Sequence, residues 1–422
     1  MIIHLPYGKK NLVFDMPDSC HSVIIEPSFS PALGDPVNAL KEALKKPIGS
    51  PSLHSIIQPT DRVGIIFNDI TRPTPSSLIL HTILQELSNI PHENISLFNA
   101  LGTHRFNTKD ELRQMLDDEL VDNYRIIQNN AFDPAAQIHL GTTKRGHEIW
   151  LNRELLDCDV KILTGFIEPH FFAGFSGGGK AIMPGMAGLV TILGNHSAQM
   201  IADPNATWGI TWGNPIWEEV REIALMVERI FLVNVTLNKN KEITGMFCGE
   251  LGEAHSRGCE FVKKTTLVRV SEPFDMVITT NSGYPLDINL YQSVKGMSAA
   301  SQIVKQGGAI IIATECRDGI PEHGMYGNLL KAYKHPKDLL KNILSFEPAC
   351  LDQWQVQIQA MLQLKADIYV YSDGLTDSQI RSTMLLPCRS IEATLAELLA
   401  KYGPQARICI LPEGPQTIPY IT

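Results

Sequence analysis

Short, continuous apolar runs alternate along this chain with segments whose apolar residues recur every three or four positions. The runs are rich in isoleucine and valine and have the length of strands buried on both faces, as in parallel sheets. They predict strands over Val63–Phe67, Ile95–Asn99, Val160–Thr164, Ile230–Thr236, Met276–Thr280, Ala309–Ala313, Ile368–Tyr371 and Arg407–Leu411. The segments between them predict helices, among them Ser76–Leu87, Trp217–Glu228, Asn289–Lys305 and Ile391–Tyr402.

Alternation of strands and helices predicts an α/β fold with mostly parallel sheets flanked by helices. A polar stretch, RVSEP, precedes a fresh apolar strand near residue 275 and indicates a domain break. We expect an N-terminal domain over residues 1–268, a C-terminal α/β domain over 272–403, and a tail over 404–422 whose return to the first domain is left open. Such folds place the active site at the carboxyl ends of strands, here in the cleft between the domains.

Composition narrows the function classes. The chain has 422 residues, a length typical of two or three domains. Its 36 basic and 45 acidic residues leave a formal net charge of −9, which argues against a nucleic-acid partner. No apolar run reaches the roughly 18 residues that span a bilayer. Eight dispersed cysteines without a Cys-x-x-Cys pair, and an N-terminus unlike a secretion signal, predict a cytoplasmic protein with reduced thiols and no membrane partner.

Two polar clusters directly follow predicted strands. NDITRPTP carries Asp69 and Arg72, and arginine is suited to bidentate capture of a carboxylate or phosphate. ALGTHR carries His104 after a Gly-Thr turn, where a histidine is placed for proton transfer. The structural alternatives are a helix cap for Asp69, a surface position for Arg72 and a merely solvated ring for His104.

The segment Gly165–Gly188 combines Glu168, His170, three consecutive glycines and Lys180. Glycines let backbone N–H groups approach an anion or a flat cofactor, although a plain turn is the alternative. The letters also fit G-x-x-x-x-G-K, the start of a phosphate-binding loop. We reject a nucleotide-dependent kinase because Ala181 stands where magnesium binding needs Ser or Thr, and because a proline interrupts the helix that should follow.

Two more clusters complete the candidate site. His196 follows a Gly-Asn turn in ILGNHSAQM. Tyr291, Gln292 and Lys295 share one face of a predicted helix and can form a clamp for a carboxylate and a hydroxyl, or simply an exposed polar face. Three loop histidines also suggest a zinc hydrolase, but H-E-x-x-H or a similarly close ligand pair is absent from the sequence. Trp354 is left open between a cleft wall and a core position.

Together these segments resemble the lactate racemase family that uses a nickel-pincer nucleotide. The motifs D-x-T-R-P, G-T-H-R, E-P-H-x-F-A-G-F-S-G-G-x-K, G-N-H and Y-Q-S-V-K-G occur in family order, from about Asp61 to the last strand. The resemblance implies two α/β domains, with the cofactor on the first and the substrate between them. It also implies nickel held by a pyridinium mononucleotide with two sulfur arms, and a dependence on the enzymes that make this cofactor.

The resemblance assigns roles to residues that match the motifs. His104 and His170 are the catalytic acid–base pair. Lys180 tethers the cofactor, and His196 binds both the cofactor and its nickel. The other cofactor-binding residues are Asp69, Arg72, Ser176, Gly177, Gly178 and Gly179. The substrate-binding residues are Arg72, Tyr291, Gln292 and Lys295.

Elementary chemistry agrees with these roles. Removing the C2 proton of a 2-hydroxyacid places charge beside a carboxylate, whereas hydride transfer leaves a neutral ketone group. Two enantiomers present their hydroxyl differently, so two histidines are expected. We therefore predict a 2-hydroxyacid racemase or epimerase acting by reversible hydride transfer, with a lactate-like substrate. The alternatives are a non-catalytic cofactor-binding protein and a metal-dependent hydrolase.

Overall fold

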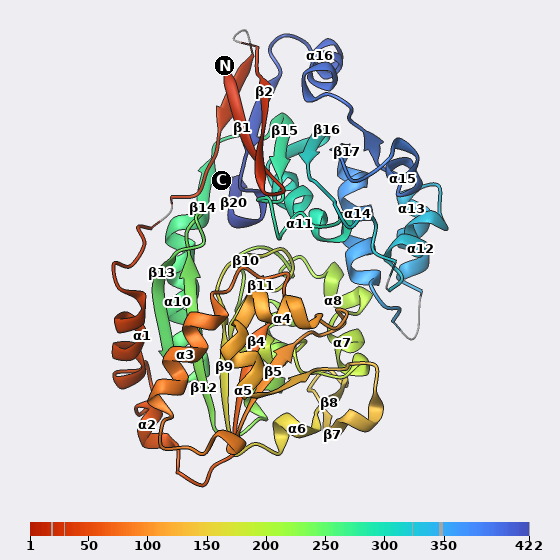
Figure 1. Ribbon diagram of the computed structural model, residues 1–422. Helices are drawn as coiled ribbons and strands as arrows, with labels where there is room; N and C mark the ends of the chain where they lie inside the picture. Colours follow the sequence, from red (N-terminus) through yellow and green to blue (C-terminus); the bar gives the residue numbers. More distant parts are fainter. Residues whose placement is uncertain (18–19, 29, 323, 346–348, 422) are drawn as a thin grey trace.

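The computed structural model describes residues 1–422 except 18–19, 29, 323, 346–348 and 422. Two six-stranded sheets, each flanked by helices, form the two halves of the molecule (Figure 1). The predicted α/β class is therefore confirmed. In the part of the chain that the structure describes, no helix is both long and apolar enough to cross a membrane.

The first sheet has the strand order β13-β12-β9-β4-β5-β6 and is parallel except for the β12–β13 pair. Its central strands β4 and β9 are apolar and buried along almost their whole length, as strands covered on both faces must be. The strands are β4 (Val63–Asn68), β5 (Ile95–Ala100), β6 (Arg125–Gln128), β9 (Val160–Phe166), β12 (Ile230–Leu237) and β13 (Ile243–Gly249).

Helices cover both faces of this sheet. One face packs against α1, α3, α4 and α5, and the other against α7, α9 and α10. The helices of this half are α1 (Pro36–Lys45), α2 (Leu53–Ile56), α3 (Ser76–Glu86), α4 (Lys109–Leu116), α5 (Asp118–Asn123), α6 (Arg153–Leu156), α7 (Leu189–Asn195), α8 (Ala198–Ala202), α9 (Pro215–Leu225) and α10 (Leu251–Thr266). Two small hairpins complete it: β7 (Gln137–Thr142) with β8 (Glu148–Asn152), and β10 (Pro169–His170) with β11 (Gly174–Phe175).

The second sheet has the order β18-β17-β16-β15-β19-β3 and is parallel throughout. Alternate residues of β15 enter different cores: Met276 and Ile278 pack with the β1–β2 hairpin and α16, and Val277 packs on the side of α11 and α14. The strands are β3 (His21–Ile24), β15 (Phe274–Thr280), β16 (Val304–Ala313), β17 (Ala366–Tyr371), β18 (Leu386–Pro387) and β19 (Arg407–Leu411). The helices are α11 (Leu290–Ser301), α12 (Tyr326–Lys331), α13 (Pro336–Ile343), α14 (Gln353–Lys365), α15 (Asp377–Ser382) and α16 (Ile391–Tyr402).

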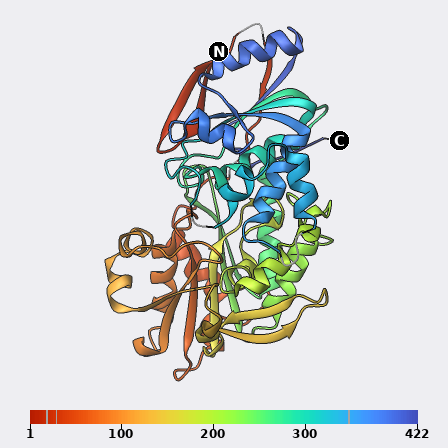
Figure 2. The same cartoon turned by 90° about the vertical axis from the view of Figure 1, so that its right-hand side faces the viewer.

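Both chain ends differ from the expected domain grouping. The N-terminal hairpin of β1 (Ile2–Tyr7) and β2 (Lys10–Asp15) packs on the second sheet, and β3 pairs with β19, so these strands do not join the first domain. Figure 2 shows these red strands beside the blue and teal sheet. In the tail, β19 lies inside the second sheet, whereas β20 (Ile418–Ile421) pairs with β14 (Leu267–Val270), which follows α10 at the expected domain break. The break near residues 268–272 stays a prediction.

All of the strands and helices named from the sequence pattern form, with ends that differ by a few residues. The largest difference is at the strand expected over Ala309–Ala313, which begins at Val304, and the helix expected over Asn289–Lys305 accordingly ends at Ser301. The periodicity of apolar residues thus locates an element better than it locates the ends of that element.

The order of the first sheet creates a crevice. Strand β4 lies at its centre, β5 follows on one side, and β9 continues the sheet on the other. The loops that leave β4 and β9 therefore diverge, and this switch point is where α/β sheets bind ligands.

Candidate active site

A cavity of about 140 Å³ lies at this switch point. The first half contributes the loops after β4, β5 and β9, and the second half contributes α11 and the start of α14. All of the predicted site residues line it except Gly178 and Gly179. The fold thus assembles one site from five segments that are far apart in the sequence.

Asp69 and His104 form a pair at the mouth of the cavity. Asp69 Oδ2 lies 2.6 Å from His104 Nδ1, and Asp69 Oδ1 accepts a hydrogen bond from Thr71 at 2.9 Å. Burial opposes ionisation of Asp69, but the His104 charge and hydrogen bond, with Arg72, lower its pKa overall. The carboxylate therefore holds the proton on Nδ1 and leaves Nε2 as the free base nitrogen. Asp69 is not a helix cap, because α3 begins after Pro75 without a side-chain cap.

His170 is held differently. It lies on the β10–β11 hairpin, is 6% exposed, and its Nδ1 accepts a hydrogen bond from the backbone N–H of Ala173 at 3.2 Å. In the neutral ring the proton is then on Nε2. Burial, followed by the charges of Lys180 and Lys295, lowers the pKa of His170 well below its ordinary value. His170 therefore stays neutral and presents an N–H donor.

Lys180 lies in a short 3-10 turn, Gly178–Ala181, with its ammonium nitrogen 5.6 Å from the centre of the Phe172 ring. Burial and the nearby Arg72 lower the pKa of Lys180 to about 7. A substantial fraction of this amine is therefore unprotonated and nucleophilic near neutral pH.

His196 follows α7 directly and is 4% exposed. Its ring meets Phe172 and Trp354 edge to face, with centroid distances of 5.1 Å to each. Burial and the Lys180 charge lower the pKa of His196 to about 3. Among the described residues, its Nδ1 has no hydrogen-bond partner. A neutral ring with an unused, buried nitrogen is well suited to binding a metal ion.

The three glycines serve the protein interior more than the cavity. Gly177 lines the cavity at φ +75°. A Cβ on Gly178, at φ +56°, would lie 2.7 Å from the His255 ring, and one on Gly179 would lie 3.0 Å from Ala224. The Gly178 N–H donates to Asn234 Oδ1 at 2.7 Å, so it does not point at a ligand. Close packing against α9 and α10 accounts for these two glycines, and their contact with the cofactor stays a prediction.

Ser176 lines the cavity, but its hydroxyl supports the chain turn. It donates to the Phe166 carbonyl at 2.9 Å and accepts from the Glu168 N–H at 2.9 Å. This pair of bonds fixes the strand end from which Glu168 and His170 follow.

The three residues of α11 do share one face, and it turns inward. Gln292 and Lys295 are 4% and 8% exposed, so the alternative of an exposed polar face is wrong. Lys295 Nζ donates to Gln292 Oε1 at 2.7 Å. Burial and the Arg72 charge lower the pKa of Lys295 to about 7. The Tyr291 hydroxyl accepts a hydrogen bond from Trp354 Nε1 at 2.9 Å.

Arg72, Lys180 and Lys295 thus converge on one cavity. Burial is the main cause of the lowered pKa of both lysines, and repulsion from the Arg72 charge lowers each pKa further. An anionic ligand relieves this repulsion, so the electrostatics favour a carboxylate or a phosphate in the cavity.

Two features were not assigned roles from the sequence. Glu168 is 9% exposed, and among the described residues its Oε2 has no hydrogen-bond partner. Burial raises the pKa of Glu168, although Arg72 and Lys295 oppose that shift. Trp354, which the sequence left open, is both buried and part of the cavity wall. Its position inside the glutamine-rich run DQWQVQ was the only sequence signal.

Comparisons with known proteins indicate the same family as the sequence motifs. A family model described as the lactate racemase N-terminal domain matches residues 7–209, and one described as the lactate racemase C-terminal domain matches residues 270–418. The lactate racemase of Thermoanaerobacterium thermosaccharolyticum is 34% identical over 422 residues, covering 99% of this chain and 98% of the relative. The chain belongs to the lactate racemase family. It is accordingly an isomerase of the racemase class, as predicted.

Further relatives agree with this membership. The lactate racemase of Lactiplantibacillus plantarum is 32% identical over 418 residues, covering 98% of each chain. The solved lactate racemase apoprotein from T. thermosaccharolyticum superposes with a TM-score of 0.92 at 33% identity, covering 99% of this chain and 100% of that one. A Thermotoga maritima protein shares the fold, with a TM-score of 0.72 at 17% identity over 92% of this chain and 99% of that one.

Membership in this racemase family decides against a non-catalytic binding protein and a hydrolase. Within the described residues, no three His, Cys, Asp or Glu side chains are grouped to hold a metal ion, so His104, His170 and His196 do not form a three-histidine site. The kinase-like loop is not realised either, because Gly178–Ala181 forms a 3-10 turn rather than the start of an α-helix.

Proposed function

We propose that this lactate racemase family member inverts C2 of a 2-hydroxyacid, with lactate as the reference substrate, by reversible hydride transfer to a nickel-pincer nucleotide. One observation carries the proposal. Two histidines, one presenting a free nitrogen and one an N–H, line a single cavity that also contains three cationic side chains. This arrangement suits a carboxylate-bearing substrate whose hydroxyl proton must move.

The residues fit the cofactor that the family resemblance implies. Lys180 supplies an amine with a lowered pKa for a covalent tether, and His196 supplies a buried nitrogen for nickel. Because the described residues hold no three-ligand metal cluster, nickel here depends on donor atoms of the nucleotide as well as His196. When bound, this group supplies a hydride acceptor next to C2 of the substrate.

Arg72 and Lys295 are the substrate-carboxylate partners in this proposal. Arg72 offers a planar fork for two oxygens, and Lys295 is held by Gln292 at 2.7 Å. Holding the carboxylate keeps C2 in place while either of its faces can be presented to the hydride acceptor. Such positioning can supply a large part of the barrier reduction.

His104 is the base for one enantiomer. Asp69 fixes its tautomer and stabilises the imidazolium that forms when Nε2 takes the hydroxyl proton. His170 serves the other enantiomer from the opposite tautomer. Once the Ala173 N–H contact is released and the ring proton lies on Nδ1, Nε2 accepts the hydroxyl proton of that enantiomer, and the same Nε2 proton returns when the hydroxyl is reformed.

The test uses protein produced together with the cofactor-making enzymes and loaded with nickel. Enantiopure L-lactate and D-lactate are followed by chiral chromatography, and both should converge on the same equal mixture. His104→Ala and His170→Ala should each lower the rate by roughly 10²–10⁴-fold. His54→Ala, at an exposed position of α2, should keep the wild-type rate. Absence of conversion of lactate and of larger 2-hydroxyacids by protein whose mass includes the cofactor would overturn the proposal.

A further inference from the structure

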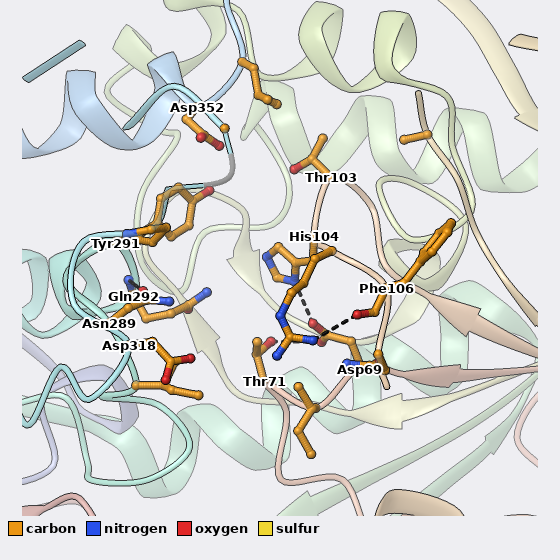
Figure 3. A pocket seen from close by; sticks show the side chains of 18 of the residues that line it. Asp69, Thr71, Thr103, His104, Phe106, Asn289, Tyr291, Gln292, Asp318 and Asp352 are labelled. Carbon is orange, nitrogen blue, oxygen red and sulfur yellow. Dashed lines mark hydrogen bonds and ion pairs between the residues drawn. The ribbon is translucent and has the colours of Figure 1, made fainter. Parts of the chain in front are cut away.

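A second, larger chamber of about 300 Å³ adjoins the catalytic cavity. The two share five lining residues, which form the passage between them: Asp69, Thr103, His104, Tyr291 and Gln292. Figure 3 shows Thr103 and His104 facing Tyr291, Gln292 and Asp318 across this chamber. Arg72, Lys180 and Lys295 line the inner cavity only.

The inner cavity has little room for a large substrate. It measures about 140 Å³, close to the about 150 Å³ of an apolar cavity known to hold one benzene molecule, and it is also lined by Lys180 and His196, the residues that would hold the cofactor. A substrate whose carboxylate binds Arg72 and Lys295, and whose hydroxyl lies at His104, already occupies the polar end of this cavity. The substituent on C2 is then directed through the passage at His104, into a chamber with twice that volume.

The outer chamber has a largely apolar lining. Its apolar members come from both halves of the molecule: Ile70, Phe106, Ala131, Phe132, Ile288, Pro321 and Leu351. The aromatic rings among them are strongly exposed, since Phe106 is 53% and Phe132 50% exposed. A bound apolar group would remove this surface from water, at about 25 cal/mol per Å² buried.

Charge in the chamber disfavours an anion. The guanidinium of Arg105 is paired with Glu111, at 2.6 and 2.8 Å, and so is already neutralised. Asp318 and Asp352 lie on the opposite wall (Figure 3). A second carboxylate on the substrate, as in malate, would meet these acids, and the described residues that line the chamber offer it no unpaired Lys or Arg.

We propose that the chamber is a specificity pocket for 2-hydroxyacids with a bulky, uncharged apolar substituent, of the 3-phenyllactate type. The inference rests on the proposed racemase function and extends it to the substrate class. The nickel-loaded holoenzyme should racemise 3-phenyllactate with a kcat/KM at least equal to that for lactate. Its kcat/KM for malate should be at least tenfold lower than for 3-phenyllactate.

An unreactive analogue separates binding from chemistry. 3-Phenylpropionate lacks the hydroxyl and cannot be racemised, but it retains the carboxylate and the ring. As a competitor of lactate racemisation it should have an inhibition constant at least tenfold lower than propionate, since even one methylene in an apolar pocket changes binding roughly 10–200-fold.

Variants locate the effect in the chamber. Ile288→Trp narrows it and should lower kcat/KM for 3-phenyllactate at least tenfold more than for lactate. Phe106→Ala removes an exposed ring and should weaken 3-phenylpropionate inhibition about tenfold without a folding defect. The matched control, Leu225→Trp, adds the same ring at an exposed position of α9 outside both cavities. It should leave the ratio of the two substrates unchanged.

The outcomes separate the two proposals. If neither lactate nor 3-phenyllactate is racemised, the proposed function fails. If lactate is racemised while kcat/KM for 3-phenyllactate is a hundredfold lower, the function stands and the specificity pocket is refuted. The specificity pocket would also be refuted if malate were turned over as efficiently as 3-phenyllactate. Equal inhibition by propionate and 3-phenylpropionate would refute it as well.

Discussion

His104 and His170 line the same cavity, but each ring is fixed at Nδ1 by a different kind of partner. Asp69 accepts the Nδ1 proton of His104, whereas the Ala173 N–H donates to Nδ1 of His170. Nε2 therefore has a lone pair in one ring and a proton in the other. Opposite tautomers suit a reaction in which one group accepts a proton and another supplies one.

Replacing Asp69 tests the role of this partner. Asp69→Asn keeps the size of the side chain but removes the charge that fixes the His104 tautomer and stabilises its protonated form. We expect kcat for lactate racemisation to fall by roughly 10²–10⁴-fold. Thr71→Val, which removes the 2.9 Å bond to Asp69 and the 3.4 Å hydrogen bond from Arg72 but no charge, should have a much smaller effect. Wild-type kcat in Asp69→Asn would show that the pair is structural.

Nickel content tests the assignment of His196. His196→Ala should lower bound nickel far more than His104→Ala or His170→Ala, because only His196 has an unused buried nitrogen in a ring kept neutral by its surroundings. The measurement is metal analysis of purified holoprotein, with melting temperatures to confirm folding. Equal nickel loss in all three variants would favour a shared histidine site and contradict the assignment.

Lys180 provides a test that depends on pH. Because its pKa falls from 10.5 to about 7, the amine is protonated below pH 7 and mostly neutral above it. Its acetylation by a small anhydride should rise through pH 7 and level off by about pH 8, whereas exposed lysines, with an ordinary pKa of about 10.4, continue to gain reactivity. Mass spectrometry of the labelled peptides measures this. A Lys180 profile parallel to that of the exposed lysines would contradict it.

At this scale the sequence indicated which side chains meet, but not how each is held. Motif order identified Arg72, His104 and Lys295 as members of one site. Two features depend on backbone turns and burial that no local pattern encodes. They are the hydrogen bond from the Ala173 N–H to His170 and, among the described residues, the lack of a hydrogen-bond partner for Glu168 Oε2.

At the scale of elements, the period of the apolar pattern located the strands and helices well. Central strands such as β4 and β9 are buried on both faces, so their sequences are almost uniformly apolar and easy to recognise. Strand β3 was missed because it is a short edge strand with mostly exposed side chains. Its place is set by pairing with β19, which lies almost four hundred residues away in sequence.

The glycine turn before Lys180 gives a prediction at this scale. Gly178→Ala places a Cβ 2.7 Å from the His255 ring at φ +56°, and should lower the free energy of unfolding by at least about 2 kcal/mol through strain and clash. Gly307→Ala, at φ +76° with no atom within 4 Å of the new Cβ, should lower it only by about 1 kcal/mol. Denaturant unfolding of both variants makes the comparison. Equal losses would show that packing against α10 does not explain the turn.

At the scale of the whole molecule, two mostly parallel sheets bring their residues to one cavity. The switch point of the first sheet presents the histidines and Lys180, and α11 of the second half brings Lys295 against them. The two-sheet plan followed from strand and helix alternation. The packing of the N-terminal hairpin on the second sheet could not be predicted, because contacts between distant segments produce no periodic pattern in the sequence.

The central claim is that the hydrogen on C2 leaves as a hydride and returns to the opposite face without exchanging with water. L-lactate carrying deuterium at C2 is incubated with nickel-loaded holoprotein in ordinary water, and the D-lactate is isolated well before equilibrium. Mass spectrometry of this product measures the label directly. The account predicts that D-lactate keeps its deuterium at C2, and D-lactate carrying hydrogen from the solvent would contradict it.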